Sequence, residues 1–164
     1  MAYLLSYTRL PIDNILYDPR LAYSMHLALS EDGKTYQALN HNSGVLFVKA
    51  TENEDGSVTP WSLSSPVMFA MEEGYGVLAQ RIGSEGDEDP ESTGKRLFFT
   101  TRDFLEYTEV GFVTEEEAKE MLAGVPKLSV PKAEDLDILG AVPSHVLEIP
   151  ENVADRLRKK LITP

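Results

Sequence analysis

Hydrophobic and polar residues alternate along two stretches of this chain that have nearly the same pattern. The first stretch is HLALSEDGKTYQAL at residues 26–39, and the second is LFFTTRDFLEYTEV at residues 97–110. Alternation is typical of a strand with one buried face, and a short polar segment with Asp and Gly is typical of a turn between two strands. Each stretch therefore predicts a β-hairpin.

The two hairpins belong to a longer internal repeat. A single offset aligns four pairs of similar residues, which are Ser30 with Thr101, Asp32 with Asp103, Tyr36 with Tyr107 and Leu39 with Val110. Upstream, each copy has a strand pattern ending in arginine, at Arg9 or Arg81, and then an Asp-Pro pair. The alternative is that two unrelated hairpins converged on similar turns, which leaves the shared flanking features unexplained. Phe104 replaces Gly33 of the first turn, which predicts a different turn geometry or a longer loop in the second hairpin.

Strand patterns fill about residues 2–50 and then about residues 65–113. The first set is AYLLSYTR, YSMHLALS, KTYQALN and GVLFVKA, and the second is PVMFAM, GYGVLAQRI, KRLFFTT and EYTEVGFV. The continuous apolar run in GVLFVKA predicts a strand that is buried on both faces. TENEDGSVTPWSL, between the sets, predicts a surface loop or hairpin tip, and the acidic GSEGDEDPESTG predicts a mobile loop.

The pattern changes after residue 113. Thr114 followed by three glutamates predicts the capping box of a short helix that stops at Gly124. A proline-rich connector follows, with a brief strand predicted at residues 145–149. Residues 151–162 predict a final helix, because Val153, Leu157, Leu161 and Ile162 share one face. We therefore expect a duplicated β-blade region at residues 1–113 and a helix, connector and helix at residues 114–164.

The composition limits the number of domains and the kinds of partner. A chain of 164 residues is long enough for one well-packed domain and short for two. Its net charge of −12 argues against nucleic acid or an anionic membrane as the main partner. It contains no cysteine, which removes disulfide and thiolate chemistry. No apolar stretch is long enough for a signal sequence or a membrane span, so we expect a soluble, cytoplasmic protein without a cofactor.

A four-stranded antiparallel unit that is repeated once is typical of a propeller blade or of a duplicated sandwich. We expect an all-β fold made of two antiparallel propeller-type blades, a partial five-bladed β-propeller, with a short C-terminal helical tail. Propellers close with about four to eight blades, and this chain supplies two. The exposed edges of two blades favour either a homo-oligomer or a continuation of the same propeller.

Four segments together resemble the opening blades of glycoside hydrolase family 43 proteins, the five-bladed propeller furanosidases and xylosidases. They are the HLAxSxDGxxYxxL hairpin, NSGVLFVKA, SSPVMFAMEEGYGVLAQR and RLFFTTRDFLEYTEVG, and the resemblance covers residues 3–113 and weakly the HVLEIPENVADRLRKKL tail. The resemblance implies a propeller fold, a sugar-facing central pocket, and hydrolysis of glycans that contain arabinose or xylose.

Two departures from the family pattern argue against catalysis by this chain alone. Glycoside hydrolysis needs two carboxyl groups flanking the scissile bond. The resemblance implies a third carboxylate, in an Asp-Pro step that opens an innermost strand, where this chain has Ser65-Pro66. The family's general acid comes from a later blade that this chain does not reach. The alternatives are a non-catalytic carbohydrate-binding or protein-interaction β-module and a small duplicated β-domain without sugar chemistry.

Four residues are candidate sugar ligands. His41 and Asn42 lie in a polar loop whose amide and imidazole groups suit sugar hydroxyls, although a plain turn has the same composition. Arg81 ends an apolar strand and is suited to a sugar or to an acid at the rim. Trp61 is suited equally to a sugar-stacking platform and to a loop anchor. The acidic run GDEDPE lacks the spaced ligands of a calcium loop, so no metal site is predicted.

Overall fold

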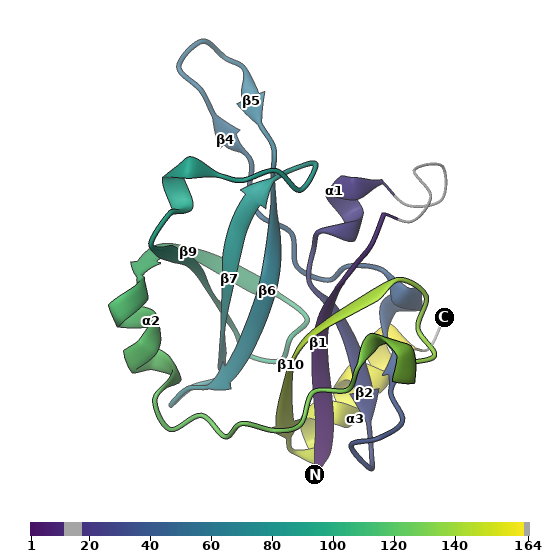
Figure 1. Cartoon of the computed structure of the whole chain (residues 1–164). Coiled ribbons are helices and arrows are strands. Elements are labelled where there is room, and N and C mark those ends of the chain that lie inside the picture. The colour runs from purple at the N-terminus through teal and green to yellow at the C-terminus, as the bar shows by residue number, and fades with distance from the viewer. Residues whose placement is uncertain (12–17, 163–164) are drawn as a thin grey trace.

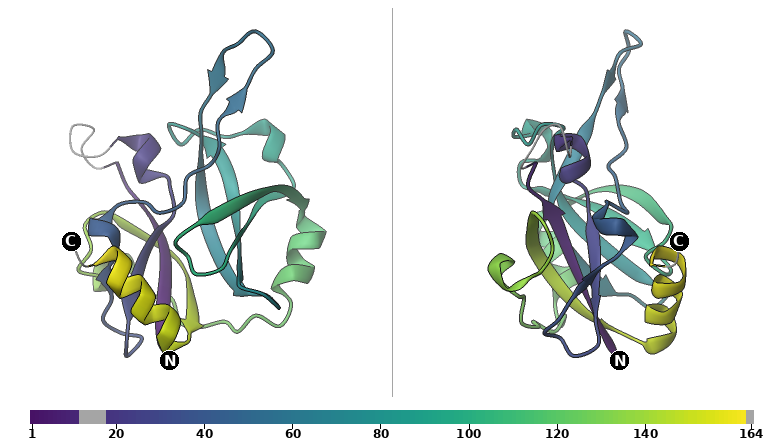
Figure 2. Two further views of the ribbon diagram at one scale, coloured as in Figure 1. Left: turned by 180° about the vertical axis from the view of Figure 1, so that it is seen from behind. Right: turned by 90° about the vertical axis from the view of Figure 1, so that its right-hand side faces the viewer.

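A computed structural model describes residues 1–11 and 18–162 of the chain, and the fold is predominantly β, as predicted. Two four-stranded antiparallel sheets form the body of the protein (Figure 1). A third, two-stranded sheet is a hairpin of β4 (Thr51–Glu52) and β5 (Val58–Thr59), which projects away from the other two sheets (Figure 2). Residues 51–60 of the segment TENEDGSVTPWSL therefore form the exposed hairpin that the sequence predicts, whereas Trp61, Ser62 and Leu63 begin β6, with Ser62 and Leu63 buried.

The first sheet combines strands from both ends of the chain. Its order is β10 (Ala141–Ile149), β1 (Ala2–Arg9), β2 (His26–Ser30) and β3 (Gln37–Ala38). β10 pairs with the whole of β1, from Ala2 opposite Ile149 to Arg9 opposite Ala141. The brief strand predicted near the end of the connector is confirmed, and it is longer than predicted. It joins residues after 113 to the first repeat.

The second sheet follows the sequence order. Its strands are β6 (Trp61–Ala70), β7 (Tyr75–Gly83), β8 (Lys95–Thr101) and β9 (Tyr107–Thr114), and each pairs with the next. All four strands predicted for this part of the chain are confirmed. β6 adjoins both β10 and β1, because the hydroxyls of Ser144 on β10 and Ser6 on β1 both donate to the carbonyl of Pro66, each at 2.7 Å. The edge strands of the two sheets therefore meet along this seam.

The two hairpin turns contain equivalent hydrogen bonds from a backbone amide to a side-chain hydroxyl. In the first turn the Ser30 hydroxyl accepts a bond from the Gly33 amide at 2.8 Å. In the second turn the Thr101 hydroxyl accepts one from the Phe104 amide at 2.9 Å. Gly33 has a φ of +76° and Phe104 a φ of +65°. The expectation of a different turn or a longer loop is therefore wrong.

Phe104 adopts a backbone conformation that few residues with a Cβ adopt. Its side chain is fully buried, and its ring lies 4.6 Å from the ring of Tyr75, centroid to centroid. In the first repeat the equivalent residue is Gly33, which has no side chain and lies beside the ring of Tyr3. Burial of the Phe104 ring offsets the backbone strain, so the second turn keeps the geometry of the first.

The main hydrophobic core lies between the two sheets, and the outer face of each sheet has a smaller core. The main core also receives Ala154 and Leu157 of α3 (Glu151–Leu161), the predicted final helix. The connector covers the outer face of the first sheet through Leu136 and Ile138, which follow η3 (Ala133–Asp135). The helix α2 (Glu115–Leu122) covers the outer face of the second sheet. Its predicted capping box at Thr114 is present.

The apolar run GVLFVKA forms no strand, which corrects the prediction. Only Leu46 bridges to the first sheet, at Met25, and Phe47 is 49% exposed while Val48 is buried. The cause lies just before the run, in η1 (Asn40–Asn42), where three consecutive residues have a φ between +53° and +58°. This left-handed turn redirects the chain, which then crosses from the first sheet toward β4.

The acidic connection between β7 and β8 is anchored at its centre, whereas its composition predicts a mobile loop. Its centre forms η2 (Pro90–Ser92), and Asp89 and Ser92 are 2% and 1% exposed. Gln80 donates to the Ser92 hydroxyl at 2.7 Å, and Arg81 holds Asp89. Hydrogen bonds between buried polar groups therefore fix this part of the connection.

Candidate functional site

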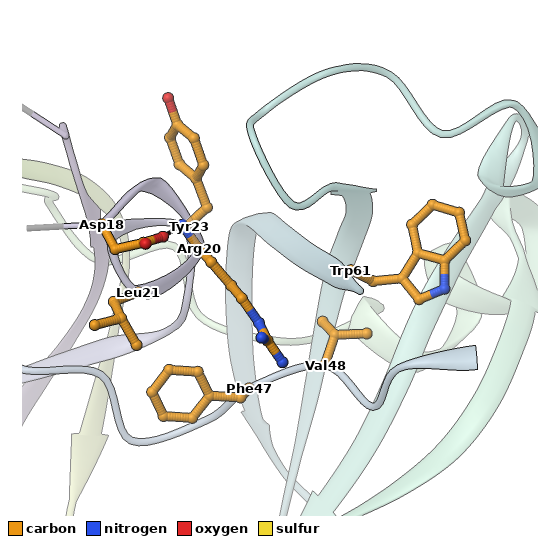
Figure 3. Close-up of a pocket in the computed structure, with 7 residues that line it drawn as sticks. All are labelled: Asp18, Arg20, Leu21, Tyr23, Phe47, Val48 and Trp61. Carbon is orange, nitrogen blue, oxygen red and sulfur yellow. Dashed lines mark hydrogen bonds between the residues drawn. The ribbon is translucent and has the colours of Figure 1, made fainter. Parts of the chain in front are cut away.

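A pocket of about 320 Å³ opens where the first repeat faces the start of β6 (Figure 3). Its walls come from three separate segments and consist of Asp18, Arg20, Leu21, Tyr23, Phe47, Val48 and Trp61. The first four belong to α1 (Pro19–Ala22) and its flanks, the next two to the segment that crosses between the sheets, and Trp61 begins β6. The pocket therefore exists only when both repeats are folded together.

Local sequence fixes the position of α1. Asp18 is its N-cap, and the Asp18 Oδ1 atom accepts a bond from the Arg20 amide at 2.8 Å. Pro19 occupies the first helical position, where a missing amide hydrogen costs nothing. The side chain of Arg20 extends from this short helix toward Phe47 and Val48 (Figure 3).

The aromatic walls differ in exposure. Phe47 is 49% exposed, whereas Trp61 is half-buried. The Trp61 Nε1 atom donates to the Thr51 hydroxyl at 2.7 Å, and the Arg81 guanidinium lies 3.9 Å from the Trp61 ring centroid. Trp61 therefore combines the two roles considered for it, because its indole is anchored by the protein and the residue also borders the pocket.

Arg81, a predicted sugar ligand, is 8% exposed and already engaged by the protein. Its Nε atom lies 2.6 Å from Asp89 and its Nη2 atom 3.0 Å from Glu91. Its guanidinium also lies 4.7 Å from the ring centroid of Phe112. With its charge paired and its guanidinium against the rings of Trp61 and Phe112, Arg81 is placed to hold Trp61.

The other two predicted ligands, His41 and Asn42, lie apart from this pocket. The Asn42 side chain accepts a bond from the Tyr7 hydroxyl at 2.6 Å and donates to the carbonyl of Leu139 at 3.2 Å. Asn42 therefore ties β1 to the loop before β10. His41 is exposed at a φ of +55°, and it is not one of the residues that line the pocket.

The carboxylates are not arranged for glycoside hydrolysis in this pocket. Asp18 is the only carboxylate among the described residues that line it, and hydrolysis needs a pair. Ser65 is exposed, with a φ of +52°, in the irregular part of β6, and the pocket lining does not include it. Across residues 1–11 and 18–162, no three His, Cys, Asp or Glu side chains are grouped to hold a metal ion.

Sequence reasoning missed Arg20, Tyr23 and Phe47. Phe47 lies in a continuous apolar run, where a single exposed member gives no signal, and Arg20 follows an Asp-Pro pair that predicts only a turn. The repeat does contain a signal for Arg20. The aligned residue of the second copy is Glu91, so the charge at this position is opposite in the two copies.

Comparisons with known proteins identify no relative: no family model matches the chain, and neither a curated protein nor a solved structure matches it. None of the described helices has the length and apolar character needed to cross a membrane.

Proposed function

We propose that this chain is a non-catalytic carbohydrate-binding β-module and that the pocket between α1 and Trp61 is its sugar site. The observation that carries the proposal is the lining, which combines three aromatic residues, Tyr23, Phe47 and Trp61, with two charged residues, Asp18 and Arg20. Small-ligand sites are typically apolar and aromatic clefts of about 300–1,000 Å³ with a few polar groups that fix orientation. Aromatic faces bind the apolar faces of sugar rings, and the polar groups bind their hydroxyls.

The proposal includes a finer description of the fold, in which the two sheets are propeller-type blades similar to the opening blades of glycoside hydrolase family 43 proteins. Two features support it. β6 to β9 form a four-stranded meander, and β1 to β3 repeat its last three strands with β10 in the place of β6. The two strands at equivalent edges, β6 and β10, lie side by side, as innermost strands of adjacent blades do. The ligand class that follows is glycans containing arabinose or xylose.

Binding can be tested with the single tryptophan of the chain as the reporter, because Trp61 borders the pocket. Arabinose, xylose and their oligosaccharides are titrated while the fluorescence and the indole N–H resonance are followed. A saturable change with one pentose series is expected. F47A should weaken this binding, because it removes an exposed aromatic wall, whereas V142A truncates an exposed apolar residue on β10 that does not line the pocket and should not. If no sugar changes either signal, the proposal is wrong.

A second function, self-association, is favoured by one observation. Within residues 1–11 and 18–162, β9 pairs with β8 alone, and Val110 on this strand is 57% exposed. Such an edge can pair with another strand. Light scattering across a range of concentrations should then show a dimer that V110K disrupts. A monomer at all concentrations contradicts this second function and leaves the sugar site unaffected.

A further inference from the structure

The two repeats contain equivalent short helical turns that differ in charge. Asp18 caps α1 and accepts a bond from the Arg20 amide at 2.8 Å, and Asp89 caps η2 and accepts one from the Glu91 amide at 3.1 Å. In each turn a proline follows the capping aspartate. Arg20 of the first repeat therefore occupies the position that Glu91 occupies in the second.

In the second repeat the three charged groups pair with one another. Asp89 is 2% exposed and pairs with Arg81 at 2.6 Å, and Glu91 completes the group with a 3.0 Å contact to the same guanidinium. The rings of Trp61 and Phe112 cover Arg81. This group leaves no unpaired charge facing a ligand, so it serves as an internal comparison for the first repeat.

In the first repeat the equivalent groups stay open. Asp18 and Arg20 are both exposed, and in the part of the chain that the structure describes neither forms an ion pair. The Oδ1 atom of Asp18 caps the helix, which leaves its Oδ2 atom as an acceptor. Both side chains line the aromatic pocket.

We infer that the pocket selects a carboxylated sugar, a uronic acid residue of a glycan, which extends the proposed sugar-binding function and rests on it. The Arg20 guanidinium pairs with the sugar carboxylate, because its planar fork matches a carboxylate with two parallel hydrogen bonds. The free oxygen of Asp18 accepts a bond from a sugar hydroxyl, and Phe47 and Trp61 contact the ring. With Asp18 and Arg20 in the lining, a bound carboxylate leaves the group one negative charge in excess, whereas a phosphate dianion would leave more and is disfavoured.

Three glycosides that differ only at C5 test the inference. Methyl β-D-xyloside carries a hydrogen there, methyl β-D-glucoside a hydroxymethyl group and methyl β-D-glucuronide a carboxylate. Titrations of the intact chain, followed by the Trp61 signals, should give a dissociation constant for the glucuronide at least tenfold below that for the xyloside. R20Q should reduce this ratio to less than twofold without weakening xyloside binding. R102Q, which neutralises an exposed arginine on the second hairpin, should leave the ratio unchanged.

Salt supplies an independent readout, because ionic screening weakens a charge pair more than ring stacking. Raising the sodium chloride concentration should weaken glucuronide binding and leave xyloside binding nearly constant. Equal affinities for the three glycosides overturn the inference while the proposed sugar site stands. An equal loss in R20Q and R102Q also overturns it, because the selectivity would then come from overall charge. If none of the three glycosides binds, the proposed function fails and the inference with it.

Discussion

Substitutions at Phe104 can separate two contributions to the free energy of unfolding: the strain of a left-handed backbone and the burial of an aromatic ring. Phe104 combines a φ of +65° with a fully buried side chain. Replacing it with alanine removes the ring but keeps the strain, and a buried Phe→Ala change costs about 3–5 kcal/mol. Replacing it with glycine removes both, and glycine tolerates this conformation better than alanine by about 1–2 kcal/mol. F104G should therefore be more stable than F104A, although it has the smaller side chain.

The first repeat measures the same strain on its own. Gly33 has a φ of +76°, and a Cβ added there would lie 3.5 Å from the ring of Tyr3, an ordinary contact distance. G33A should therefore cost only the backbone strain, and its loss of unfolding free energy should equal the difference between F104A and F104G. Urea unfolding followed by circular dichroism gives all three values. If F104A is as stable as F104G or more stable, the ring does not offset a strained turn and the reasoning is refuted.

Two further predictions concern buried charge. R81Q leaves Asp89 buried without its partner and should lower the free energy of unfolding, measured in urea, by about 3–5 kcal/mol. The double variant R81Q/D89N should recover part of this loss. Equal stability of R81Q and the parent would contradict the ion-pair role. Burial lowers the pKa of His26 from 6.5 to about 4 in the folded protein. Between about pH 6.5 and about pH 4 the unfolded chain is therefore protonated at this residue while the folded chain is not. The free energy of unfolding should fall by about 3 kcal/mol as the pH drops through this range. H26N should remove that part of the pH dependence, and an unchanged pH profile of unfolding in H26N would show that His26 is not its source.

Sequence patterns predicted the elements whose signals are local. Both hairpins, the four strands of the second sheet and the cap at Thr114 each depend on residues close together in the sequence. The strand expected in GVLFVKA failed because the left-handed turn at residues 40–42 lies outside the run and decides its direction. The tight second turn was missed because a buried ring far along the chain offsets the strain at Phe104.

The candidate site was predicted less well than the fold, because three distant segments form it. Trp61 was found as the one tryptophan beside a turn. Arg81 and Asn42 have side chains that suit a sugar, but in the folded protein Arg81 binds Asp89 and Asn42 binds Tyr7. These partners are set by the tertiary structure. Proximity between α1, the crossing segment and β6 has no local sequence signature, and for that reason Arg20 was not predicted.

The pairing of β10 with β1 also sets the order in which the protein can be completed during synthesis. The second sheet consists of consecutive strands and can form as soon as residues 61–114 have been made. The first sheet must wait for residues 141–149, so one edge of β1 stays open while most of the chain is translated. Contacts of such long sequence separation form slowly, and an open strand edge can pair with another chain in the meantime. Truncation before β10 should therefore lead to aggregation and not merely to a smaller folded protein.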